Sequence, residues 1–125
     1  MQRELEEWRD RAHDDLNAAR HLRTNLGIPG GVAAFHYQQA TEKALKGLLI
    51  ADGDPPTKTH DLRALLTRLA DRVKADHNTV EALTAFAVLG RYPGFSAQVP
   101  EDELDAFDKL AKSCVDQLGI EISIR

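Results

Sequence analysis

The 125-residue chain contains one cysteine, Cys114. No internal disulfide can therefore form, which favours a reducing compartment. No run of residues approaches the roughly 18–20 consecutive apolar residues that a membrane-spanning helix needs. The N-terminal stretch, MQRELEEWRDRAHDDL, is too highly charged for the apolar core of a signal peptide. These absences predict a cytoplasmic protein that does not associate with a membrane.

The chain also lacks an excess of positive charge. It has 16 Lys and Arg against 20 Asp and Glu, a formal net charge of −4 at pH 7. This argues against a broad basic surface that binds nucleic acid regardless of sequence, although a local basic pocket is compatible with it. Hydrophobic residues make up 42% and charged residues 29%, as in ordinary globular proteins. The length suits one domain with a core of its own and is too short for two.

Several metal and cofactor sites are excluded by missing motifs. No Glu-x-x-His pair occurs, so a di-iron site in a helical bundle is not expected. One cysteine and five scattered histidines give no zinc-binding spacing. The stretch GIPGG, residues 27–31, lacks the Lys-Ser/Thr ending of a phosphate-binding P-loop and does not follow a strand. We therefore expect neither a metal nor a resident cofactor, and keep a nucleotide as a candidate ligand.

Strand signals are few, and the apolar periodicity predicts five helices. The first helix has an apolar stripe that consists of Leu5, Trp8, Ala12, Leu16, Ala19 and Leu26. GIPGG ends this helix, and the second runs from about Val32 to Asp52, where GDPP ends it. The third begins near KTHDL, residues 58–62, with Thr59 as a plausible N-cap.

The second half of the chain is more irregular. EALTAFAVLG carries no charge from Ala82 to Gly90, which predicts a helix buried nearly all round. The fifth helix starts at the acidic EDEL, and the tail GIEISIR predicts an extended segment or a frayed end. Short connections between amphipathic helices predict an all-α fold: a compact bundle of four principal helices plus one shorter accessory helix, mostly antiparallel.

The second helix combines a polar row with an unusually wide apolar face. His36, Gln39, Lys43 and Lys46 recur every three or four positions. The apolar residues sweep from roughly 60° to 260° around the helix, about twice the arc needed for packing on one neighbour. This predicts a central helix. Gln38 and Glu42 fall inside the apolar arc, where a subunit interface or a buried hydrogen bond would account for them. The row itself is either a solvated face or a binding site.

Three motifs together resemble the HEPN family, the higher eukaryote and prokaryote nucleotide-binding domain. They are AAFHYQQATEKALKGLL (the FHxQQAxEKALK type), KTHDL and RYPG, in this order, and the resemblance covers roughly residues 5–118. It implies a single HEPN-like helical domain over residues 1–125, often a homodimer. It also implies a partner, a minimal nucleotidyltransferase encoded by a neighbouring gene, in a toxin–antitoxin or defence-type pair.

Active members of this family are metal-independent endoribonucleases, and their signature is an Arg followed by four to six residues and a His. The His moves a proton to or from a ribose or leaving oxygen, and the Arg holds the phosphate. Arg72 and His77 have this spacing. They lie earlier in the chain than the family's pair, however, and Val73 stands where a polar residue is typical. We therefore lean towards a protein without this activity.

Arg91, in RYPG, is the only charged residue from Ala82 to Pro100. A buried guanidinium needs a partner. Arg91 either forms a salt bridge with Asp61 or Glu42 or caps a helix. Alternatively, it binds one phosphate together with His36, Lys43, Lys58 and His60. No His follows His77, so Arg91 lacks the usual partner for cutting RNA.

Three functional hypotheses follow. The first is a non-catalytic HEPN protein that binds a nucleotide or an RNA phosphate. The second is an endoribonuclease that uses Arg72 and His77, or Arg91 with His36 or His60 across a dimer. The third is a homodimeric interaction module without a ligand. The candidate ligand-binding residues are His36, Gln39, Lys43, Lys58, His60, Asp61 and Arg91.

Overall fold

The computed structural model describes residues 1–55, 57–70, 72–89 and 98–125. Three long helices form the body of the molecule: α1 (Gln2–Leu22), α2 (Gly30–Ala51) and α6 (Glu101–Ser123). Three short helices lie between α2 and α6 in the sequence: α3 (Leu62–Arg68), α4 (His77–Thr84) and α5 (Phe86–Leu89). The predicted all-α bundle is confirmed, with short helices in place of a fourth long one among the described residues.

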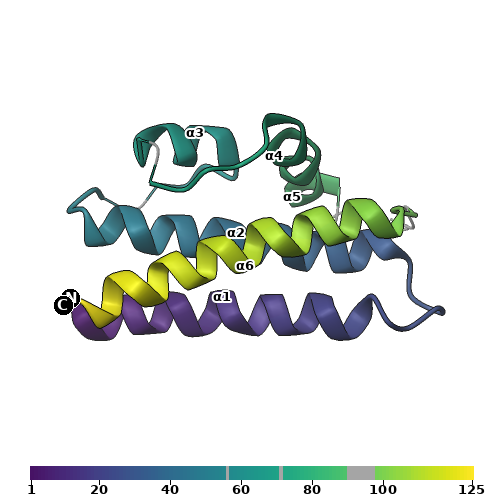
Figure 1. The fold of residues 1–125 in the computed structure, drawn as a ribbon, viewed down its shortest axis with the longest axis horizontal. Coiled ribbons are helices and arrows are strands. Elements are labelled where there is room, and N and C mark those ends of the chain that lie inside the picture. The colour runs from purple at the N-terminus through teal and green to yellow at the C-terminus, as the bar shows by residue number, and fades with distance from the viewer. Residues whose placement is uncertain (56, 71, 90–97) are drawn as a thin grey trace.

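The long helices lie side by side, and the short ones cover one side of them (Figure 1). α1 runs antiparallel to α2, and α6 runs in the same direction as α2. The segment from α3 to α5 returns the chain along the bundle, so that α6 can start at the same end as α2. Both termini lie together at the opposite end (Figure 1). None of the helices in the described residues has an apolar stretch that could cross a bilayer.

The predicted central position of the second helix is confirmed. α2 packs against each of the five other helices that the described residues form, and 15 of its 22 residues are buried. Its wide apolar arc is matched by small residues that let neighbours approach closely. At Gly47, a Cβ atom would lie 2.7 Å from Leu118 Cδ2 and 3.2 Å from Trp8 Cβ. Glycine at this position therefore allows α1 and α6 to pack tightly on α2.

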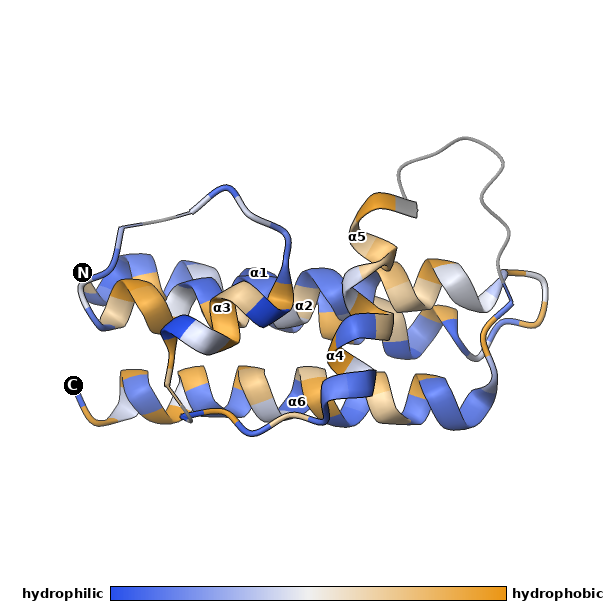
Figure 2. Cartoon of the chain, turned by 90° about the horizontal axis from the view of Figure 1, so that it is seen from above, coloured by the Kyte–Doolittle hydropathy of each residue, from blue (hydrophilic) through white to orange (hydrophobic). Residues whose placement is uncertain are grey.

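One hydrophobic core joins all the long helices. Figure 2 shows the apolar side of α6 turned towards the rest of the bundle and its hydrophilic side turned away. Tyr37 and Phe107 are the largest fully buried side chains of the core. Cys114 is buried too, and burial raises the pKa of its thiol to about 12, so it stays protonated and serves as a core residue.

Four local expectations were wrong. Leu26 does not extend the stripe of α1, because the helix ends at Leu22 and Leu26 is fully exposed. The N-cap of α3 is Asp61, not Thr59: the Asp61 carboxylate accepts a hydrogen bond from the backbone N–H of Arg63 at 3.0 Å. Over its described part, residues 82–89, the uncharged segment is not one buried helix, because Ala85 separates α4 from α5 and Val88 is 53% exposed. The tail is neither extended nor frayed, since α6 continues to Ser123.

Candidate functional site

The N-terminal half of the polar row on α2 faces α1 and converges on Asp15. The Asp15 carboxylate lies 3.0 Å from His36 Nδ1 and 2.5 Å from Lys43 Nζ. Burial raises the pKa of Asp15, but the hydrogen bonds and charges of His36 and Lys43 outweigh it, so the pKa lies below its usual 3.8. One carboxylate from α1 thus fixes an imidazole and an ammonium group that are both partly exposed, at 29% and 27% of their side-chain area.

The second cluster surrounds Glu42, whose side chain is only 7% exposed. Its carboxylate accepts hydrogen bonds from Gln38 Nε2 at 3.0 Å and Lys46 Nζ at 3.1 Å, and lies 2.9 Å from His60 Nδ1. Burial raises the pKa of Glu42, but these three contacts outweigh it and bring the pKa below its usual 4.5. Of the two explanations for polar residues in the apolar arc, a buried hydrogen bond is the one that the structure shows.

Gln39 is linked to the second cluster, because its Nε2 donates a hydrogen bond to Gln38 Oε1 at 2.7 Å. The polar row of α2, together with its partners, reaches from Asp15 on α1 to His60, just before α3. We call it the α2 polar strip; its residues are Asp15, His36, Gln38, Gln39, Glu42, Lys43, Lys46 and His60. His36, Gln39, Lys43 and His60 of the predicted ligand set belong to it.

Both histidines of the strip are held in the same way. His36 and His60 each direct Nδ1 towards a carboxylate, that of Asp15 on α1 or of Glu42 on α2. This contact orients the ring and leaves Nε2 as the nitrogen available to a ligand. His60 is the more open of the two, with 46% of its side chain exposed. Such an anchored imidazole can donate a hydrogen bond to an anion or exchange a proton with one.

The remaining predicted ligand residues have other positions. Lys58 is exposed, two residues before His60, and Asp61 is the exposed cap of α3. Arg91 lies outside the described residues, so its grouping with His36 and His60 stays a prediction.

Arg72 and His77 each have other partners. The Arg72 guanidinium forms ion pairs with Asp52 and, at 3.1 Å, with Glu121 of α6. The His77 Nδ1 atom lies 3.0 Å from an amino group of Arg63 on α3. Their side chains are thus engaged with different residues, and a shared catalytic role for them stays a prediction.

The comparisons with known proteins agree with the motifs. A model of the HEPN domain matches residues 5–117. The chain belongs to the HEPN domain family. The crystal structure of TT1696 from Thermus thermophilus resembles it with a TM-score of 0.71 and 28% identity, over 97% of this chain and 99% of that one. The crystal structure of ST0689, an archaeal HEPN homologue, also resembles it. The TM-score is 0.72 and the identity 26%, over 94% of this chain and 97% of that one. No curated protein matches the chain.

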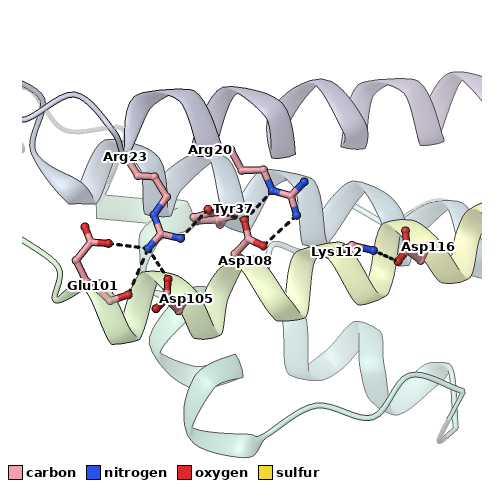
Figure 3. Close-up of polar contacts among 8 residues, drawn as sticks. All are labelled: Arg20, Arg23, Tyr37, Glu101, Asp105, Asp108, Lys112 and Asp116. Atoms are coloured by element: carbon pink, nitrogen blue, oxygen red, sulfur yellow. Dashed lines mark hydrogen bonds and ion pairs between the residues drawn. The ribbon is translucent and has the colours of Figure 1, made fainter.

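This HEPN domain has a further polar network, which the sequence did not reveal, where α1, α2 and α6 meet (Figure 3). Asp108 accepts hydrogen bonds from Arg20 Nε at 2.8 Å and from the buried Tyr37 hydroxyl at 2.7 Å. Arg23 pairs with Glu101 and Asp105 at the start of α6. Burial and the Asp108 carboxylate raise the pKa of Tyr37 to about 12. Because these partners satisfy one another, the network clamps the long helices together.

Within the described residues of this HEPN domain, no three His, Cys, Asp or Glu side chains are grouped so that they could hold a metal ion. The α2 polar strip offers two oriented imidazoles, the Lys43 ammonium group and the Gln39 amide beside two carboxylates whose pKa is lowered, whereas its other members, Gln38 and Lys46, are buried.

Proposed function

We propose that this HEPN domain is a non-catalytic protein that binds a nucleotide or an RNA phosphate at the α2 polar strip. The observation that carries the proposal is the convergence of His36 and Lys43 on Asp15 in a partly exposed position. A phosphate needs charge-assisted donors that are already positioned. The Nε2 of His36 and the remaining protons of the Lys43 ammonium group meet this need, because Asp15 occupies only one side of each.

We propose that the domain does not cleave RNA, for a chemical reason. Cleavage of RNA without a metal needs a proton-transferring group and a cation on the same phosphate. Arg72 is engaged with Asp52 and Glu121, and His77 contacts Arg63 instead. The rival function, a metal-independent endoribonuclease, is favoured by one observation: the carboxylate contacts of His36 and His60 resemble those that orient catalytic histidines.

Isothermal titration calorimetry with ATP, GTP and a short RNA tests the binding. We expect His36→Ala and Lys43→Ala each to weaken binding by about 10- to 100-fold, the range of one hydrogen bond to a charged group. The matched controls are His21→Ala and Lys112→Ala, because both residues are exposed and belong to other helices. They should bind like the wild type. Equal affinities for all five proteins would remove the strip as a phosphate site.

The same proteins, together with His60→Ala, should be incubated with structured RNA in EDTA. We expect no cleavage by the wild type. Cleavage that disappears in His36→Ala or His60→Ala, but persists in His21→Ala, would overturn the non-catalytic assignment and make the domain a ribonuclease.

We also propose that the protein acts as a homodimer and with a minimal nucleotidyltransferase, in a toxin–antitoxin or defence-type pair. Family membership supports the enzyme partner, and a nucleotidyltransferase reading frame beside this gene would strengthen that support.

A surface feature supports the dimer. Ile120 and Ile124, which are 55% and 73% exposed, line a groove between α6 and α1. The groove also carries Arg9, His13, Asp10 and Asp116, charges of both signs that a two-fold axis can pair.

The dimer proposal predicts the effect of a charge placed in this groove. Ile120→Arg should convert the dimer into a monomer, because a guanidinium at the centre of an apolar contact would lose its hydration without a partner. Light scattering after size-exclusion chromatography measures the mass. Val88→Arg is the matched control, since Val88 is an exposed apolar residue on α5, outside the groove. A wild-type protein with the mass of one chain would contradict the proposal.

A further inference from the structure

A groove at the seam of α1 and α2 adjoins the α2 polar strip. It has a volume of about 370 Å³ and is lined by Glu4, Glu7, Trp8, Arg11 and Lys43. Pockets for small ligands typically start at about 300 Å³. Lys43 belongs to both the groove and the strip, because its ammonium group contacts Asp15. The two features therefore form one continuous surface.

Trp8 gives this groove an aromatic wall. It is the only tryptophan in the chain, and it is partly buried against the core. Its Cβ would lie 3.2 Å from a Cβ added at Gly47, so the absence of a side chain at Gly47 lets Trp8 pack directly on α2. A tryptophan held in this way is a rigid platform for a planar heterocycle, and nucleobases stack on such platforms.

The charges along α1 are ordered by their position on the helix. Glu4 and Glu7 come first, then Trp8, then Arg11 and Asp15, at the spacings of three and four residues that place side chains on one face. Trp8 and Asp15 are separated by seven positions, about 10 Å along the helix axis. The acidic end of the groove thus lies on one side of Trp8. The cationic end, with Arg11 and Lys43, lies on the other, next to His36.

This order matches the polarity of a nucleotide. Carboxylates accept hydrogen bonds from the N–H groups of a base, whereas Arg and Lys bind its phosphate. Arg11 makes no hydrogen bond or ion pair with any other described residue, so its guanidinium is available. Guanine suits the acidic end best, since it presents adjacent N–H donors on one edge, whereas an unmodified uracil presents one N–H between two carbonyl groups.

From this arrangement we propose that the seam groove is the base-binding part of the site and takes a purine nucleotide. The base stacks on Trp8 with its N–H edge towards Glu4 and Glu7, and the phosphate reaches Arg11, Lys43 and His36. The inference rests on the proposed function, because it assigns the base and the orientation to the ligand whose phosphate the strip binds.

Trp8 also provides the measurement. Because the chain has no other tryptophan, quenching of its fluorescence by GMP reports stacking at this position alone. We expect GMP to quench the emission with saturation and to bind more tightly than UMP or the base-free ribose 5-phosphate. In calorimetry, Trp8→Leu should weaken GMP binding by about 5- to 100-fold, the range of one stacked base, whereas Trp8→Phe should keep most of it. Arg11→Ala should weaken binding too, and Arg3→Ala, on the same helix outside the groove, should not.

Thermal unfolding of each variant separates a lost contact from a damaged fold, and Trp8→Phe, which keeps an aromatic ring, serves as the folded reference. If GMP binding is lost in Lys43→Ala but unchanged in Trp8→Leu, the groove is not the base site, although the proposed phosphate site stands. Equal affinity for GMP and ribose 5-phosphate would likewise overturn base recognition. If GMP does not bind, the groove proposal is wrong; if ATP, GTP and the short RNA do not bind either, the proposed function is wrong as well.

Discussion

Replacing Glu42 with alanine is expected to lower the free energy of unfolding by about 3–5 kcal/mol, the usual cost of removing one partner from a buried ion pair. The side chains of Glu42 and Lys46 are only 7% and 9% exposed. Without the carboxylate, the Lys46 ammonium group stays buried without an anion, and Gln38 and His60 lose an acceptor. Urea denaturation followed by circular dichroism measures the loss.

Two controls isolate the cause. Glu81→Ala removes an exposed glutamate, and its effect should stay within about 0.5 kcal/mol. The double variant Glu42→Leu/Lys46→Met removes both charges and should recover most of the stability, because apolar replacements of a buried pair are often neutral. A single variant as stable as Glu81→Ala would mean that the Glu42 cluster does not stabilise the fold.

The pH dependence of the same variant provides a second readout. Because the pKa of Glu42 is lower in the folded protein than its usual 4.5, its stabilising contribution is complete above about pH 5 and is lost as the pH falls through the folded value. Asp15 has a lowered pKa as well and acts in the same direction. The wild type should therefore lose stability in acid, and Glu42→Ala should lose less over the same range.

Asp108→Ala is expected to lower the free energy of unfolding by about 2–3 kcal/mol. The larger part should come from Tyr37, whose hydroxyl donates to Asp108 at 2.7 Å from a fully buried ring. Arg20 should contribute less, because 41% of its side chain is exposed and water can replace the carboxylate.

A double-mutant cycle with Tyr37→Phe separates these parts, and we expect a coupling energy of about 1.5–2 kcal/mol between Asp108 and Tyr37. Asp116→Ala is the matched control: it removes an aspartate from an exposed pair with Lys112 on the same helix (Figure 3) and should cost at most about 0.5 kcal/mol. Equal losses for the two aspartates would show that the network of Figure 3 does not clamp the helices.

The central position of α2 could be predicted from the sequence because it depends on the pattern of apolar residues around this one helix. An apolar arc too wide for a single neighbour requires a central position, and α2 contacts all five other helices. Glu42 and Gln38 stood out for the same reason, as polar side chains inside that arc. A buried hydrogen bond was one of the two explanations foreseen for them, although not the His60 ring that shares the carboxylate.

What could not be predicted depends on contacts between helices. Asp15 borders the apolar stripe of α1, three residues after Ala12 and four before Ala19, but this spacing does not show which side chains of α2 it meets. Only the packing of α1 on α2 brings it to His36 and Lys43. The apolar stripe of α1 predicts Trp8 as a core residue, and its place beside a groove follows from the close approach at Gly47. The break at Ala85 was missed because an uncharged stretch gives no sign of where a helix stops.

The most direct test of the α2 polar strip as a phosphate site is a ¹H–¹⁵N correlation spectrum of the histidine side chains during titration with GMP. The wild-type protein should show a saturable shift of the His36 Nε2 resonance, assigned with His36→Ala, while the resonances of the exposed His21 stay unchanged. In Lys43→Ala the same shift should need about 10- to 100-fold more GMP. A His36 resonance that stays unchanged at saturating GMP would contradict the assignment of the strip as the phosphate-binding site.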